Sequence, residues 1–229
     1  MIVLSVETST PLGSLAIGQV NKNSCQVMAS LQWEKKSSHS ELITLYLQKA
    51  LSQAHLSLHQ IEALSLGNGP GSFTGLRVAV NFIRSLSYAL NKPIYPFSSL
   101  ELLHSPLSST NYTLCTLKAF RNLIYFSLYP PQDTKPLLPP QAQTFEDFFK
   151  LLATYQSQNL TCVGNLNGLI KSQLPYQTNW TFIDRTPMAE HALERLSKPP
   201  CPPPLKWNEL KPLYIRASEA EEKAKSQTQ

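Results

Sequence analysis

The residues with the clearest capacity for chemistry lie in a glycine-rich segment over residues 67–77, which reads GNGPGSFTGLR. Four of the chain's eight glycines fall in it. Glycine concentrated at one turn indicates positive φ angles or the close approach of another backbone or a ligand, and free amides at the start of a following helix suit an anion. The residues placed to contact an anion or nucleotide are Gly69, Gly71, Ser72, Thr74 and Gly75. The spacing matches neither the Walker A loop nor the dinucleotide fingerprint.

Hydroxyl groups in the same segment could be taken for nucleophiles. Ser72 and Thr74 would sit on a tight turn between a strand and a helix, where hydrolases of the Gly-x-Ser-x-Gly type place theirs. That motif is absent from the segment, and no ordered base and acid can be named that would activate a hydroxyl. We therefore interpret both residues as helix caps and assign no catalytic residue.

Two histidines have the spacing of metal ligands. His55 and His59 are four residues apart, as ligands on one face of a helix are, but only Glu62 lies near enough in sequence to add a third ligand. We interpret them as surface or helix-end histidines and predict no metal site. His39 and His191 are likewise interpreted as cap and surface residues.

The composition excludes several classes of protein. With 42% apolar residues over 229, the chain can fill a hydrophobic core, which excludes wholesale disorder. The net charge of +5 is dispersed, without the basic run of a dedicated nucleic-acid patch. No basic leader or long apolar span is present, so we expect a cytoplasmic protein without membrane contact. Four widely spaced cysteines are interpreted as buried small hydrophobes: Cys25, Cys115, Cys162 and Cys201.

Alternating short β-like runs and helical patterns predict an α/β protein. The first half predicts strands over residues 2–6, 13–18, 27–33, 63–67 and 93–97, and helices over 38–54, 75–90 and 99–104. A similar order returns in the second half, with strands over 112–119, 122–129 and 160–163, a short strand or extended segment over 213–215, and helices over 144–155 and 186–196. The proline-rich stretch 199–204 is expected to be an extended linker. We expect an N-terminal subdomain over 1–104, a C-terminal subdomain over 105–218 and a polar tail over 219–229.

The two longest predicted helices carry wide apolar faces. Apolar side chains spread over about 180° of the helix at 38–54 and about 200° of the helix at 75–90, whereas one sheet-facing stripe needs about 100°. Two interpretations are open: the helices pack on each other and under the second half, or the surplus apolar surface binds a partner. The candidates for a partner interface are Leu42, Ile43, Tyr46, Leu47, Ala50, Leu76, Val80, Ile83 and Leu86.

Taken as a whole, the segment at residues 67–77 resembles a loop of the TsaB (YeaZ) family of tRNA threonylcarbamoyladenosine biosynthesis proteins. The likeness extends over residues 2–9, 38–51, 61–96 and 213–216. The sequence departs from the family's pattern at Glu7, where the family has Asp, and at Ala79, where it has Gly. It departs again where the family has Asp-Ala-Arg and this chain has Lys118-Ala119-Phe120-Arg121.

The resemblance implies an actin/Hsp70/sugar-kinase (ASKHA) fold of two ribonuclease-H-like subdomains, the second reduced. It also implies a non-catalytic subunit that supports transfer of a threonylcarbamoyl group to tRNAs reading codons that begin with A. The implied partners are the catalytic subunit TsaD, the ATPase TsaE, tRNA through the complex and, for the protein alone, a second copy. Docking would use the two long helices. No cofactor is expected to be tightly bound, and a nucleotide could lie at the interface of the complex.

The sequence itself agrees with a non-catalytic role at one point. TsaD-like enzymes place a His-x-x-x-His metal motif after the strand that corresponds to residues 93–97, and here His104 stands there without a second histidine. Two alternatives remain in view. One is an ATP-dependent small-molecule kinase of the same fold, and the other is a TsaD-like metallopeptidase.

Overall fold

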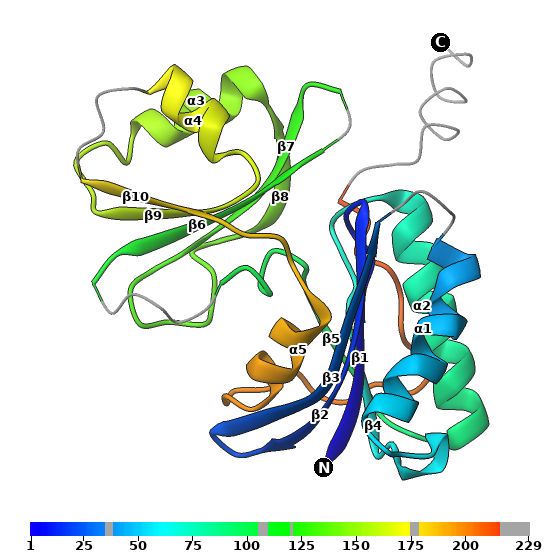
Figure 1. Ribbon diagram of the computed structural model, residues 1–229. Coiled ribbons are helices and arrows are strands. Elements are labelled where there is room, and N and C mark those ends of the chain that lie inside the picture. Colours follow the sequence, from blue (N-terminus) through cyan, green and yellow to red (C-terminus); the bar gives the residue numbers. More distant parts are fainter. Residues whose placement is uncertain (35–38, 105–109, 120, 175–178, 216–229) are drawn as a thin grey trace.

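The computed structural model describes residues 1–34, 39–104, 110–119, 121–174 and 179–215. They form two halves, each built on a five-stranded mixed sheet (Figure 1). The predicted polar tail, the Ser38 end of the first predicted helix and Phe120 lie outside the described residues. No helix of the described part is both long and apolar enough to cross a membrane.

The sheet of the first half has the strand order β3-β2-β1-β4-β5, in which β1 pairs antiparallel with β2 and parallel with β4. Its strands are β1 (Ile2–Glu7), β2 (Leu12–Asn21), β3 (Ser24–Glu34), β4 (Ala63–Gly67) and β5 (Ile94–Phe97). One face is covered by α1 (His39–Gln53) and α2 (Phe73–Leu90), with the short 3-10 helix η1 (Leu58–Gln60) between them in sequence. Leu4, Leu64 and Ile83 lie fully buried in the core between this face and the helices.

The sheet of the second half repeats this pattern in the order β10-β9-β6-β7-β8. Its strands are β6 (Tyr112–Lys118), β7 (Leu123–Tyr129), β8 (Leu138–Thr144), β9 (Leu160–Gly164) and β10 (Trp180–Asp184), and its helices are α3 (Phe145–Ala153) and α4 (Asn167–Gln173). In both halves the first strand in sequence pairs antiparallel with the second strand and parallel with the fourth strand: β1 with β2 and β4, and β6 with β7 and β9. This duplicated ribonuclease-H-like arrangement is the predicted ASKHA fold.

The two halves exchange covering elements. Helix α5 (Ala189–Leu196) follows the second sheet in sequence but packs on the face of the first sheet opposite α1 and α2 (Figure 1). In return, Leu100 and Leu103, which follow β5, join the apolar cluster of the second sheet. A partly buried ion pair of 2.8 Å between Arg195 Nε and Glu101 Oε1 links the two exchanged segments. The predicted domain boundaries at residues 104 and 218 stay predictions.

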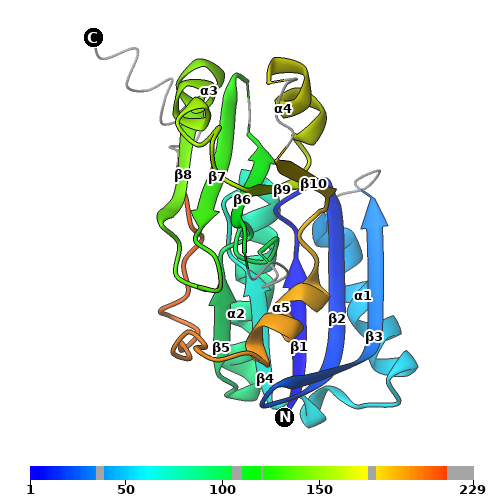
Figure 2. The ribbon, with the colours of Figure 1, turned by 90° about the vertical axis from the view of Figure 1, so that its left-hand side faces the viewer.

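The chain also returns to the first half after α5, as an extended segment that we call the strap (residues 205–214; Figure 2). Leu205 exchanges two backbone hydrogen bonds with Ile94 on the free edge of β5. Leu210 is buried in the core of the first half. The Leu213 amide donates to the Asn68 carbonyl at 2.7 Å, so the strap is attached at both of its ends.

Several sequence-based expectations need correction. Residues 99–103 form turns rather than a helix, because their amides bond three as well as four residues back and the segment is too short to propagate. Strands β8 and β10 and helix α4 were not expected at all. β8 contains Pro139 and Pro140, which obscure a strand in the sequence but are tolerated at the edge of a sheet.

Candidate functional site

The glycine-rich loop joins β4 to α2 and lies beside the carboxyl end of β1. Its backbone is bonded to three separate parts of the chain. The Asn68 amide donates to the Phe97 carbonyl at 2.9 Å, and the Ser72 amide donates to the Ser9 carbonyl at 2.7 Å. With the strap bonded to Asn68 as well, the loop joins β1, β5 and the strap at one point.

The glycines of this loop allow close approach of the protein's own atoms. A Cβ on Gly67 would overlap the Glu7 carboxylate, one on Gly71 would overlap Ser9, and one on Gly75 would overlap the Thr8 carbonyl oxygen. Gly69 has a φ of +119°, and a Cβ there would lie 2.8 Å from the Leu213 carbonyl oxygen. The loop therefore requires glycine both for a positive φ angle and for the close approach of other parts of the chain. An anion or nucleotide site at Gly69, Gly71, Ser72, Thr74 and Gly75 stays a prediction.

The two hydroxyls of the loop differ in role. Ser72 is the N-cap of α2, and its Oγ accepts from the Gly75 amide at 3.3 Å, which confirms its interpretation as a cap. Thr74 is the second residue of α2 and is exposed, so its interpretation as a cap is wrong. Thr8 directly follows β1. Its hydroxyl donates a hydrogen bond to the Gly75 carbonyl at 2.8 Å and holds the start of α2 against the end of β1.

Glu7 is enclosed under the loop and is fully buried. Its Oε1 accepts the Ser9 amide at 2.5 Å, and its Oε2 accepts the Ser99 hydroxyl at 2.9 Å. Burial raises the pKa of the Glu7 carboxyl to about 7, although the hydrogen bonds from Ser9 and Ser99 act in the opposite direction. Near neutral pH this carboxyl therefore holds a proton in a substantial fraction of the molecules.

Glu7 makes folding stability depend on pH. Between pH 4.5, its ordinary pKa, and about pH 7, the folded protein retains a proton that the unfolded chain has lost, so the free energy of unfolding falls as the pH rises. The full loss is about 3 kcal/mol. Glu7→Gln removes this dependence, so urea denaturation at pH 5 and pH 8 should show the wild type losing more stability than the variant. Parallel losses in the two proteins would contradict the assignment.

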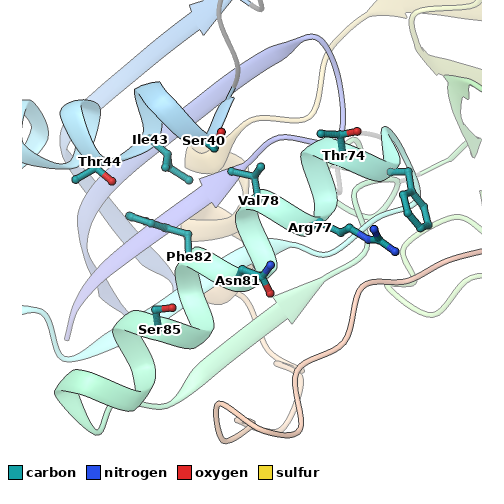
Figure 3. A pocket seen from close by; sticks show the side chains of 10 residues that line it. Ser40, Ile43, Thr44, Thr74, Arg77, Val78, Asn81, Phe82 and Ser85 are labelled. Atoms are coloured by element: carbon teal, nitrogen blue, oxygen red, sulfur yellow. The ribbon is translucent and has the colours of Figure 1, made fainter.

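A groove of about 460 Å³ runs between α1 and α2 (Figure 3). Val78 and Phe82 of α2 point toward α1 along its floor, facing Ile43. Thr44 and Ser85 are exposed at its edges, and the exposed Arg77 and Asn81 of α2 also line it. The groove therefore has an apolar floor and a polar rim.

Six of the nine predicted interface residues are not available to a partner. Three side chains of each helix are buried in the molecule itself, namely Ile43, Leu47, Ala50, Leu76, Val80 and Ile83. The remaining three, Leu42, Tyr46 and Leu86, are partly buried against the same core. The wide apolar faces are covered because Trp33 packs on Tyr46 at 4.7 Å between ring centroids, and because the strap adds Leu210 to the core.

The histidines divide into two groups. His55 and His59 are exposed, as predicted, and the described residues contain no group of three His, Cys, Asp or Glu side chains that could hold a metal ion. The prediction for His39 as a surface residue is wrong: it is buried at the start of α1, and its Nδ1 accepts the Trp33 indole N–H at 3.0 Å. His191 does cap α5, since its Nδ1 accepts the Met188 amide at 3.1 Å, but it is half-buried.

The prediction that the cysteines are buried is confirmed for two of the four. Cys115 and Cys162 are buried, whereas Cys25 is half-exposed and Cys201 is exposed.

At the departure from the family's pattern, Lys118 is an exposed residue at the end of β6, and its amide donates to Asn165 Oδ1 at 3.0 Å. The backbone of this region is thus tied to the loop after β9.

The chain matches known proteins over its central part. A family model described as "TsaD: tRNA N6-adenosine threonylcarbamoyltransferase" matches residues 33–183. The chain is 28% identical over 131 residues to a protein of Haemophilus influenzae named tRNA threonylcarbamoyladenosine biosynthesis protein TsaB, covering 56% of this chain and 53% of that protein. It is 33% identical over 102 residues to the protein of that name from Buchnera aphidicola subsp. Acyrthosiphon pisum, covering 44% of each. The chain thus spans about half the length of these curated relatives.

Two solved structures have a similar fold along nearly the whole chain. One is a Pseudomonas aeruginosa protein described as similar to peptidase YEAZ, with a TM-score of 0.72, 19% identity, and coverage of 94% of this chain and 99% of that chain. The other is YeaZ from Pseudomonas aeruginosa, with a TM-score of 0.66, 18% identity, and coverage of 93% and 99%. At this level of identity the likeness shows the fold.

Proposed function

Because the chain belongs to the TsaD family of tRNA N6-adenosine threonylcarbamoyltransferases, and within it to the TsaB (YeaZ) family, we propose that it is a non-catalytic subunit of the complex that makes threonylcarbamoyladenosine in tRNA. Its role is to bind and support a catalytic TsaD subunit, with TsaE and tRNA as further components. The tRNAs concerned are those that read codons beginning with A.

The observation that carries the non-catalytic part is the filled junction between β1 and the glycine-rich loop. Its one carboxylate, Glu7, is fully buried and accepts hydrogen bonds from Ser9 and Ser99. A general base must come within hydrogen-bond reach of a substrate proton, and this carboxylate is enclosed by the loop, where Gly67 packs against it. The geometry therefore supports a structural role for Glu7.

The experiment that tests the function combines cells and purified protein. Depleting the protein should lower threonylcarbamoyladenosine in cellular tRNA, measured by mass spectrometry of nucleosides, and the isolated chain should catalyse no threonylcarbamoyl transfer. Adding it to purified TsaD and TsaE should restore transfer. Normal levels of the modified nucleoside after depletion, or turnover by the isolated chain, would overturn the proposal.

We propose that the groove between α1 and α2 is the docking site for the partner helices, either of TsaD or, for the protein alone, of a second copy. A nucleotide at the interface of this complex remains part of the proposal. The support is the apolar floor formed by Val78 and Phe82 between polar edges, which matches the anatomy of protein interfaces. The partner surface that we propose is therefore the groove between the two helices, in place of their buried faces.

A substitution at the edge of the groove tests this site without touching the core. Ser85→Arg places a long charged side chain in the groove from an exposed position, and we expect it to weaken binding to TsaD by about tenfold or more. Ser52→Arg, at an exposed serine of α1 that is not part of the groove, is the matched control. Equal affinity of both variants in calorimetry would show that the partner binds elsewhere.

A further inference from the structure

A stripe of aromatic and arginine side chains runs along α2, on the flank that meets the strap. Phe73, Arg77, Arg84 and Tyr88 fall within about 60° of one another around the helix at about 100° per residue. At about 1.5 Å per residue they span about 22 Å of its length. The stripe therefore forms one continuous line on α2 rather than scattered positions.

The strap adds a second aromatic ring at each end of this line. Tyr214 stacks on Phe73 with 4.5 Å between ring centroids and an interplanar angle of 21°, and its hydroxyl accepts from Arg77 Nε at 3.2 Å. At the other end, Trp207 meets Tyr88 edge to face at 5.1 Å. Each end is thus a pair of rings from two different segments.

Guanidinium groups accompany both pairs of rings. The Arg77 guanidinium lies 4.1 Å from the centre of the Phe73 ring, and that of Arg84 lies 5.9 Å from the centre of the Trp207 ring. The rings are accessible: Tyr88 is 70% exposed and Trp207 is 40% exposed. The contacts between rings anchor the strap to α2. Anchoring alone does not account for the exposure of Tyr88, most of which remains in solvent.

The charge of this face is one-sided. Helix α2 contains two arginines and no acidic residue over its 18 residues. The strap adds the exposed Lys206 and Lys211 against a single acid, Glu209, whose Oε2 already accepts the Lys206 amide at 2.7 Å. An excess of cations over carboxylates suits a polyanion, and exposed rings beside the cations suit unpaired bases, which stack on aromatic side chains and on guanidinium planes.

We propose that this face of α2 and the strap binds single-stranded RNA, with the unpaired bases of the tRNA anticodon loop stacking on Tyr88 and Trp207. The arginines contact the phosphate backbone beside these bases. This inference rests on the proposed function for the choice of tRNA, and it adds a direct RNA contact made by this chain. Phe73 and Arg77 also line the groove between α1 and α2, whereas Arg84, Tyr88 and Trp207 are not part of its lining. The bases are therefore placed on Tyr88 and Trp207, outside the groove.

The test measures RNA binding by fluorescence anisotropy over a series of salt concentrations. The probe is an unmodified stem-loop of the anticodon arm from a tRNA that reads a codon beginning with A, mixed with the full chain alone and with TsaD. Tyr88→Ala should weaken binding by about tenfold, the loss of one stacked base, and Tyr88→Phe should restore most of it. Arg84→Gln should weaken binding and reduce the slope of log affinity against log salt by about one.

The chain offers a matched control in its second half. Lys171 on α4 is exposed and also lies over an aromatic ring, with its Nζ 4.8 Å from the centre of Phe182. Lys171→Gln removes the same charge and should leave the affinity and the salt slope within twofold of the wild type. Equal losses in Arg84→Gln and Lys171→Gln would overturn the proposal, because they would reflect net charge alone.

Further outcomes separate this inference from its premise. No binding by the chain with or without TsaD, or equal affinity for a fully paired RNA duplex, would overturn the RNA site. A loss of TsaD binding in Tyr88→Ala with unchanged RNA affinity would also overturn it, since the face would then be a protein interface. If depletion leaves threonylcarbamoyladenosine normal while the stem-loop still binds as expected, the proposed function fails and the RNA site stands.

Discussion

Replacing Gly67 by alanine is expected to destabilise the protein by about 4 kcal/mol, a large part of the total stability of a typical domain. Intrinsic preference predicts the opposite sign, because alanine is favoured over glycine inside a strand by about 0.5–1 kcal/mol. The new methyl group, however, would overlap the Glu7 carboxylate and approach Ser99. Overpacking costs about 1–3 kcal/mol, and moving the buried carboxylate off its donors adds to this.

Chemical denaturation of Gly67→Ala provides the measurement, and two further variants identify the cause. Gly168→Ala on α4, where a Cβ would meet nothing within 4 Å, should leave the protein as stable as before or raise its stability by up to about 1 kcal/mol. In a Glu7→Ala background, Gly67→Ala should cost much less, since the overlapping group is gone and the two changes are coupled. Additive costs in the double variant would mean that the contact with Glu7 is not what requires glycine.

The glycine-rich loop illustrates what the sequence could and could not predict. Four glycines within nine residues predicted that something approaches the backbone closely, and the Ser72 cap followed from its place before a helix. Local patterns specify such features because the atoms involved are near in sequence. What approaches the loop is distant: Glu7, Thr8 and Leu213 come from the two ends of the chain, and no local pattern contains that information.

The same distinction explains the helix faces. Both helices do carry wide apolar faces, and the repeated order of strands and helices in the sequence predicted the fold. A single apolar stripe of about 100° is sufficient only for a helix that one sheet alone covers. The strap brings Leu210 into the core of the first half from the far end of the chain, and Trp33, held by His39, covers Tyr46. Cover contributed by remote segments makes a wide apolar face compatible with a buried one.

Ile83→Asp is the second change with a very large expected effect, because it should unfold the protein. Ile83 is fully buried in the core between α2 and the first sheet. Its replacement loses about 1.5–3 kcal/mol of apolar burial, and a carboxylate there would be desolvated without a partner, at a cost of several kcal/mol more. The sum is comparable with the whole stability of a typical domain. We expect the variant to lack a cooperative thermal transition in circular dichroism.

This expectation differs from the interpretation of the sequence, in which Ile83 of α2 and Leu47 of α1 were candidates for a partner surface. Ser85→Arg, two residues further along α2 and exposed, should melt within a few degrees of the wild type. An Ile83→Asp variant that also melted there would place Ile83 outside the core. Because loss of the fold also abolishes every binding activity, failure of Ile83→Asp to bind TsaD would carry no information about the surface, whereas the same failure in a folded Ser85→Arg variant locates the partner in the groove.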